Sequence, residues 1–189
     1  MNINAYVDGS YNADTNEYGF GVYVVSEDKP PSAYFGRGFC KEGGRQVEGE
    51  VQAAKFAIAK FAGEENALHI FYDYEGVEKW ATEKWRTNKG YTKEYAEFAK
   101  DYGNVTFIHT KGHTGVFGNE VADGLAKAGA CIAQTSASKK ALKEAGIDID
   151  RIGYPVSVGE IRIYEIVPEK VDEMVAQRIS NKEIGDIER

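Results

Sequence analysis

The chain has 189 residues, 42% of them hydrophobic and 28% charged, which is enough to bury one substantial core and carry an appended element. No stretch approaches eighteen uninterrupted apolar residues, and Met1 to Ala5 lack the basic and apolar regions of a secretory signal, so we expect a cytoplasmic protein without a membrane partner. The net charge of −7 argues against a broad basic surface, but it does not exclude a metal-dependent site, which needs carboxylates. Cys40 and Cys131 are expected to be ordinary reduced thiols.

Three apolar runs near the N-terminus predict three strands. Residues 3–8 alternate apolar and polar and are followed by Gly9-Ser10. A second run at 19–25 follows a polar stretch with Asn12, Asp14 and Asn16, and the two runs fit antiparallel strands around a turn. A third run at 33–40 ends in the glycine-rich stretch 41–45. Together these features predict an antiparallel meander of three strands.

After the meander, helical and strand patterns alternate. Apolar residues at intervals of three and four give residues 50–61 one apolar helical face, whereas the short apolar run at 68–72 is typical of a buried strand. The remaining predicted elements are a helical segment at 77–81, a helix at 91–102, a strand at 105–108 and a helix at 121–132. The order predicts an α/β fold with a mixed sheet of five strands, three antiparallel and then parallel ones, and helices on both faces.

The composition changes after about residue 133, so we expect one domain over 1–133 and a C-terminal extension over 134–189. Within the extension, the pattern predicts a polar linker, two helical turns, a β-like run and a last helix, at 134–138, 139–145, 154–167 and 168–179 respectively.

The β-like run contains Ile161, Ile163 and Ile166, which need a partner surface. We expect this surface to come either from the rest of the chain, by intramolecular docking, or from self-association.

Four acidic residues fall at special positions of the predicted elements. Asp8 ends the first strand, Glu50 lies in the first turn of the first helix, Asp73 ends the fourth strand, and Asp123 lies in the helix after the last strand. Functional groups in open α/β sheets gather beyond the strand ends, so Asp8 and Asp73 face one another if their strands are adjacent. Each residue alone also has an ordinary structural explanation, as a turn, a helix-end charge, a cap or a solvated side chain.

The sequence around these carboxylates forms an ordered set of motifs. The motifs are Tyr6-Val7-Asp8-Gly9-Ser10, Gly49-Glu50-Val51-Gln52-Ala53-Ala54, Tyr72-Asp73, and Lys111-Gly112-His113-Thr114-Gly115 followed by Gly118-Asn119-Glu120-Val121-Ala122-Asp123. In these motifs and in strand order, residues 1–132 resemble the type 1 ribonuclease H family. Any one motif is weak, but the complete ordered set is highly specific. The resemblance implies a ribonuclease H-like fold and an endoribonuclease that hydrolyses the RNA strand of RNA–DNA hybrids, leaving 5′-phosphate and 3′-hydroxyl ends.

The resemblance also implies a site for two Mg²⁺ ions, with Mn²⁺ as a substitute. Such hard cations take oxygen ligands, and a pair roughly 4 Å apart can grip both the attacking and the leaving oxygen. In the family pattern Asp8 bridges both ions, Glu50 and Asp73 complete the leaving-group side, and Asp123 supports the nucleophile side. His113, in the glycine-rich loop, is expected to shuttle a proton or assist product release. Glu120, one helical turn before Asp123, is expected to tune metal occupancy.

Strand choice is expected to depend on the ribose 2′-hydroxyl, which distinguishes RNA from DNA. The candidates that recognise it are Glu50 and the backbone around Gly9 and Ser10. Arg45 and Gln46 stand where many members carry Thr-Asn in a phosphate-holding turn, which predicts that phosphate binding is altered rather than lost.

A second substrate contact is expected beside the DNA strand. Residues 76–90 are similar to the family's segment there, and Trp85 is the expected contact, while Trp80 is equally consistent with a core residue. A basic protrusion found in some members is not evident, and only a modest set of cations accompanies the aromatic residues: Lys79, Lys84, Arg86, Lys89 and Lys93.

Two alternatives remain open. Another nuclease of the same fold would use a similar carboxylate cluster, although the loop at 111–113 and the compact spacing disfavour it. A non-catalytic protein that binds hybrids or acts as a scaffold would not need all four carboxylates, and the extension lacks a basic footprint.

Overall fold

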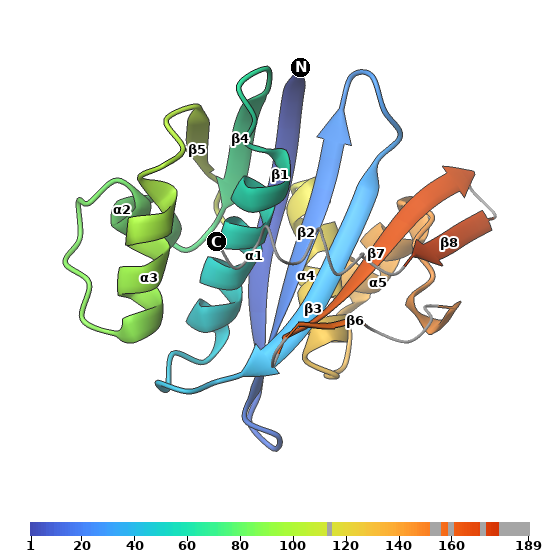
Figure 1. Cartoon of the computed structure of the whole chain (residues 1–189). Helices are drawn as coiled ribbons and strands as arrows, with labels where there is room; N and C mark the ends of the chain where they lie inside the picture. The colour runs from blue at the N-terminus through green and yellow to red at the C-terminus, as the bar shows by residue number, and fades with distance from the viewer. Residues whose placement is uncertain (113–114, 152–155, 159–160, 171–172, 178–189) are drawn as a thin grey trace.

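The computed structural model describes residues 1–112, 115–151, 156–158, 161–170 and 173–177 (Figure 1). The strands are β1 Asn2–Asn12, β2 Glu17–Ser26, β3 Ser32–Phe39, β4 Ala67–Tyr72, β5 Val105–His109, β6 Val156–Val158, β7 Ile161–Lys170 and β8 Glu173–Gln177. The helices are α1 Gln46–Phe61, α2 Gly76–Ala81, α3 Gly90–Ala99, α4 Phe117–Gly129 and α5 Ser136–Glu144, with a 3₁₀ turn at Ile149–Arg151.

The strands form one mixed sheet in the order β5-β4-β1-β2-β3-β7-β6, with β8 paired to β7. Strands β1, β2 and β3 are antiparallel neighbours, while β4 runs parallel to both β1 and β5. This confirms the predicted fold class. The expected number of strands was too low, because the described residues form eight strands and the extension supplies β6, β7 and β8.

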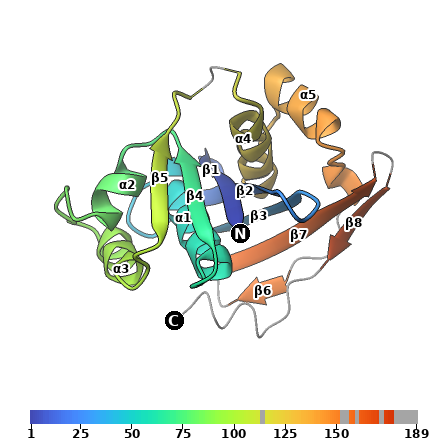
Figure 2. The same ribbon diagram turned by 90° about the horizontal axis from the view of Figure 1, so that it is seen from above.

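Helices cover both faces of the sheet. Side chains along each strand point alternately to one face and the other, so both faces carry apolar residues that helices can bury. Val7 and Val22 belong to the core cluster that includes the buried face of α1. Tyr23 and Phe35 instead pack in a second cluster with Val121 of α4 and residues of α5. Figure 2 shows α4 and α5 stacked beside each other above the sheet.

The boundaries of two N-terminal elements differ from the expectation. Strand β1 does not end at Asp8 but continues through Gly9-Ser10 to Asn12, with Gly9 paired to Phe20. The turn lies in the polar stretch between the two strands, where Asn12 Oδ1 accepts from the Asp14 backbone N–H at 3.0 Å and Asn16 adopts a φ of 54°. Helix α1 begins at Gln46, so Glu50 lies just beyond the first turn.

The extension begins with a capped helix and not with a long linker. The Thr135 hydroxyl accepts from the Ser138 backbone N–H at 3.1 Å and starts α5 directly. Gly146, with a φ of 71°, follows the helix, as the sequence indicated.

The predicted last helix, 168–179, is wrong for the described residues. Strand β7 continues through Pro168 to Lys170, and β8 pairs back on it with a register irregularity between Pro168 and Lys170. Proline lacks a backbone donor and is tolerated in sheets at such irregularities, so strand pairing overrides the helix-start signal that Pro168 gives.

The isoleucines of β7 find their partner surface within the chain. Strand β7 pairs antiparallel with β3, with Ala33 opposite Ile166, and both Ile163 and Ile166 are buried. The division into a domain over 1–133 and an extension over 134–189 stays a prediction. Among the described residues, no helix is both long and apolar enough to cross a bilayer.

Candidate active site

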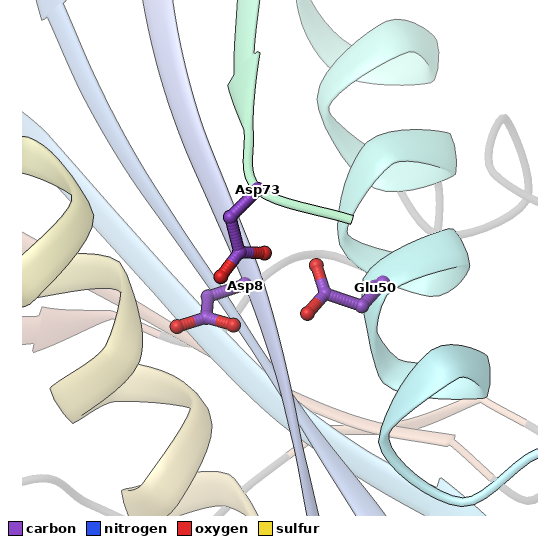
Figure 3. A group of neighbouring side chains, drawn as sticks. All are labelled: Asp8, Glu50 and Asp73. Atoms are coloured by element: carbon purple, nitrogen blue, oxygen red, sulfur yellow. The ribbon is translucent and has the colours of Figure 1, made fainter. Parts of the chain in front are cut away.

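Three carboxylates converge at the centre of the sheet (Figure 3). Asp8 lies within β1, Glu50 on α1, and Asp73 directly after β4. Each offers an oxygen, and these oxygens all lie within 4.8 Å of one another. The predicted approach of Asp8 and Asp73 has a simple cause, since β1 and β4 are adjacent parallel strands.

Glycines allow Glu50 to reach this cluster. A Cβ on Gly9 would lie 2.3 Å from the Gln46 carbonyl oxygen and 2.4 Å from the Glu50 backbone nitrogen, and a Cβ on Gly49 would lie 2.3 Å from the Gly19 carbonyl oxygen. Helix α1 therefore rests directly on the backbone of β1 and β2. The motif glycine Gly9 acts through this close approach and not through a turn.

Asp123 approaches the cluster from the other side. Helix α4 packs closely on β2, since a Cβ on Gly21 would lie 2.3 Å from the Ala122 carbonyl oxygen. Asp123 shares a small cavity with Asp8 and Asp73, but it is not among the three residues whose oxygens meet within 4.8 Å. Its carboxylate forms an ion pair with Lys127, one turn later on α4.

Burial and mutual repulsion oppose ionisation of the clustered carboxyl groups. Burial, and next the charge of Asp73, raises the pKa of Asp8 from 3.8 to about 7, although the Gly9 backbone N–H donates to its Oδ1 at 2.7 Å. Burial, and next the charge of Asp8, raises the pKa of Glu50 well above its usual value. Ionisation of these groups together therefore requires a compensating positive charge.

The unpaired oxygens fit a hard divalent cation. Among the described residues, four buried side-chain oxygens have no hydrogen-bond donor: Glu50 Oε2, Asn119 Oδ1, Glu120 Oε2 and Asp123 Oδ2. A buried polar atom without a partner is costly, and oxygen atoms of this kind are the preferred ligands of Mg²⁺ or Mn²⁺.

Glu120 and Asn119 line the small cavity beside Asp123. Its volume of about 10 Å³ has room for roughly one water. Glu120 thus lies with the carboxylates, as its spacing from Asp123 indicated.

A larger cleft, of about 550 Å³, connects the carboxylates with the expected substrate contacts. Its lining residues are Asp8, Gly9, Ser10, Tyr11, Arg45, Gln46, Val47, Glu50, Asp73, Tyr74, Asp123 and Lys127. All four predicted carboxylates therefore share one cleft with Gly9, Ser10, Arg45 and Gln46.

Trp85 lies outside the cleft lining, in an aromatic group next to it. It packs edge-on against Trp80 and Tyr74, with ring centroids 5.9 and 6.5 Å away, and Tyr74 itself lines the cleft. Trp80 is a core residue, whereas Trp85 remains 38% exposed.

The cations near Trp85 are largely engaged within the protein. Lys79 pairs with Glu75, Lys84 with Glu78 at 2.5 Å, and Lys89 Nζ donates to the Glu42 carbonyl oxygen at 2.7 Å. Their charge is therefore less available to phosphate than the sequence indicated.

His113 lies outside the described residues. Sequence reasoning missed Lys127 and Asn119, which line the two cavities. The signal for Lys127 was its position four residues after Asp123, which places the two side chains on one helix face. Asn119 Nδ2 donates to Thr110 Oγ1 at 2.5 Å, a contact that only the folded chain brings about.

The family model described as RNase H matches residues 1–131. No curated protein sequence gives a match to the chain.

Three solved structures are similar in fold. RNase H1 from the halophilic archaeon Halobacterium salinarum NRC-1 is 23% identical, with a TM-score of 0.52, and the match covers 68% of this chain and 97% of that one. The N-terminal RNase H domain of Rv2228c from Mycobacterium tuberculosis is 14% identical, with a TM-score of 0.53, and the match covers 75% of this chain and 99% of that one. LC9-RNase H1, a type 1 RNase H with the type 2 active-site motif, is 19% identical, with a TM-score of 0.51, and the match covers 74% of this chain and 80% of that one. At these identities the likeness is one of fold.

Proposed function

The chain belongs to the RNase H family and is a ribonuclease H-type hydrolase, and we propose that it cuts the RNA strand of RNA–DNA hybrids, leaving 5′-phosphate and 3′-hydroxyl ends. The observation that carries the proposal is the convergence of Asp8, Glu50 and Asp73 within 4.8 Å, in one cleft with Asp123. A family whose activity depends on divalent metal needs such a cluster.

We assign Asp8, Glu50, Asp73 and Asp123 to a site for two Mg²⁺ ions, which Mn²⁺ can replace. Asp8 contributes to both positions, Glu50 and Asp73 to the leaving-group side, and Asp123 to the nucleophile side. The chemistry that the ions supply when bound is activation of water and stabilisation of the leaving oxygen. The buried oxygens of Glu50 and Asp123 that have no donor among the described residues support the assignment.

The residues of the cleft provide recognition. Glu50 and the backbone at Gly9 and Ser10 are assigned to the ribose 2′-hydroxyl, and their shared cleft supports this role. Arg45 and Gln46, on the same cleft, are assigned to a phosphate.

Further roles rest on the motifs and on position. Trp85 is assigned to the DNA strand, where its exposed ring can pack against sugar or base. Glu120 is assigned to tuning of metal occupancy. His113 is assigned to proton transfer or product release from its motif alone.

The test is incubation of the full chain with end-labelled RNA–DNA hybrid, duplex DNA and duplex RNA, each with Mg²⁺, Mn²⁺ or a chelator. We expect metal-dependent cleavage of the RNA strand of the hybrid only. Equal cleavage of duplex DNA would favour another nuclease of this fold, and tight binding of hybrid without cleavage would favour a binding or scaffold protein. Either result would refute the proposed activity.

Asp8→Asn tests the site itself. We expect this variant to lose turnover while it retains the native circular dichroism spectrum, because only a ligand charge is removed. Asp14→Asn, in the exposed β1–β2 turn, is the matched control and should cleave as the wild type does. Normal cleavage by Asp8→Asn would refute the metal assignment.

We also propose that the C-terminal extension docks on the chain's own sheet through β7, supported by the burial of Ile163 and Ile166 beside β3. Sedimentation over a range of concentrations should then give a monomer, and a dimer would favour self-association. The cytoplasmic location stays a prediction.

A further inference from the structure

The loop between β3 and α1 is folded around one buried carboxylate, that of Glu48, which is 7% exposed. Glu48 Oε1 accepts from the backbone N–H groups of Gly44 and Glu42, at 2.9 and 3.3 Å, and from the Cys40 thiol at 3.1 Å. Glu48 Oε2 accepts from the Lys41 backbone N–H at 3.3 Å. A buried carboxylate is stable only when donors surround it, so these contacts define the shape of the loop.

The loop ends at Arg45 in an unfavourable backbone conformation. Arg45 has φ 55° and ψ −131°, a region that glycine adopts readily and a residue with a Cβ does not. The conformation is held from both sides, since the Arg45 N–H donates to Cys40 Sγ at 3.2 Å and the Arg45 carbonyl oxygen accepts from the Glu48 N–H at 3.2 Å. Strain of this kind persists only where the surroundings enforce it, and it is commonly linked to function.

The Arg45 side chain has no structural task that would explain this strain. It is exposed, it lines the cleft, and no hydrogen bond or ion pair joins its guanidinium to the described residues. Two glycines, Gly43 and Gly44, directly precede it, so the chain carries arginine where a third glycine would be easier to fold.

The far end of the loop is fixed as well. The Glu42 carboxylate accepts from the backbone N–H groups of Gly90 and Tyr91, at 2.7 and 3.1 Å, at the start of α3. The loop is thus pinned between α1 and α3.

A cleft rich in carboxylates repels a polyanion such as a nucleic acid. A cation held at the rim of the cleft would counteract this repulsion by binding a phosphate. Guanidinium is suited to this task because it stays charged and can donate two parallel hydrogen bonds to phosphate. We propose that Glu48 is a positioning residue, whose buried carboxylate folds residues 40–45 so that Arg45 grips a backbone phosphate of the substrate duplex. The proposal rests on the proposed function and adds Glu48 to it.

The test measures binding of a fluorescein-labelled RNA–DNA hybrid by anisotropy in Ca²⁺, over a series of salt concentrations. Arg45→Gly should weaken binding about tenfold and reduce the salt slope by about one phosphate contact. The same change should raise the melting temperature, because it relieves the unfavourable φ. A merely structural role for Arg45 would give a lower melting temperature.

Glu48→Gln should weaken binding and raise KM while kcat at saturating hybrid stays unchanged, because it disturbs only the loop. In the Arg45→Gly background, Glu48→Gln should cause no further loss, since it acts through Arg45. Where Glu48→Gln does not fold, Glu48→Asp takes its place in both backgrounds, because it keeps the charge but draws the carboxylate back from the donors of the loop.

Cys131→Gly is the matched control, because Cys131 also has a positive φ, of 55°, but lies outside the cleft lining. It should raise the melting temperature without any change in hybrid binding.

The proposal would be overturned if Arg45→Gly left the salt slope unchanged. It would also be overturned if Glu48→Gln reduced the affinity for hybrid equally with Arg45 present and with Arg45 replaced by glycine. If the wild type cleaves hybrid, such results refute only the positioning role. A wild type that neither binds nor cleaves hybrid refutes the proposed function, and the role of Glu48 with it.

Discussion

Lys127 forms an ion pair with Asp123 in the cleft that also contains Asp8, Glu50 and Asp73. Both side chains are mostly buried, with 14% and 10% exposure. The ammonium group thus neutralises the carboxylate that we assign to the nucleophile side. A metal ion that binds Asp123 has to share this carboxylate with the Lys127 ammonium group or displace the ammonium group from it.

Lys127→Met should therefore strengthen Mg²⁺ binding. The change keeps most of the length of the side chain and removes its charge. We expect the affinity for Mg²⁺ to rise about two- to fivefold, the range of a modest ion pair. Calorimetric titration of the metal-free protein with Mg²⁺ measures this directly. Lys140→Met, which removes an exposed pair with Glu144, is the control. Unchanged or weaker binding would show that Lys127 does not compete with the cation.

The stability of the metal-free protein should fall as pH rises from about 4 through about 7. The pKa of Asp8 is raised from 3.8 to about 7 in the folded state, so in this interval the folded state binds more protons than the unfolded one. Stability from this group is complete below pH 4 and is lost as the carboxyl ionises.

Asp8→Asn isolates this contribution. The melting temperature of the variant should exceed that of the wild type by a margin that grows from pH 4 to pH 8, and Mg²⁺ should narrow the margin by stabilising the wild type. Asp14→Asn should give no such trend. Parallel curves for Asp8→Asn and wild type would contradict the raised pKa.

Gly9→Ala should damage both folding and turnover. The new methyl group would lie 2.3 Å from the Gln46 carbonyl oxygen, so α1 has to move away from β1 and takes Glu50 with it. We expect a loss of about 3 kcal/mol in the free energy of unfolding, measured by urea titration. Gly103→Ala, where a Cβ has nothing within 4 Å, should cost far less and leave turnover intact. Equal stability of the two variants would show that α1 does not rest on Gly9.

Ile166→Ala should destabilise the whole protein if β7 is part of the same folding unit. Ile166 is fully buried, and truncation of such a side chain costs about 2–4 kcal/mol. The partly buried Ile161 offers the control, since Ile161→Ala should cost less. A single unfolding transition whose urea midpoint is lower for Ile166→Ala would indicate that β7 and the rest of the sheet unfold as one unit. A separate transition at low urea would indicate that the extension unfolds independently.

The sequence predicted those parts of the site that depend on chain order and on the alternation of strands and helices. The approach of Asp8 to Asp73 follows once β1 and β4 are neighbours, and the motif order indicated this. The sequence could not predict that Glu50 reaches Asp8 and Asp73 because α1 rests on Gly9. The distance between two backbone segments leaves no periodic pattern in the sequence.

The errors came from local signals that tertiary structure overrides. Asp8-Gly9 is typical of a turn, yet the partner strand β2 keeps this segment extended. Pro168 is typical of a helix start, yet pairing with β8 keeps β7 extended. The network of Glu48 joins residues of one loop through side-chain contacts that composition does not encode.

The pairing of β3 with β7 also sets the order in which the protein can be completed during synthesis. The Tyr34 hydroxyl donates to Glu165, 131 residues later in the chain. Because a nascent chain leaves the ribosome from its N-terminus, the outer backbone groups of β3 stay uncovered until β7 has been made. The carboxylates of the cleft are all translated before that point, so β7 docks on a sheet whose central residues are already available to fold.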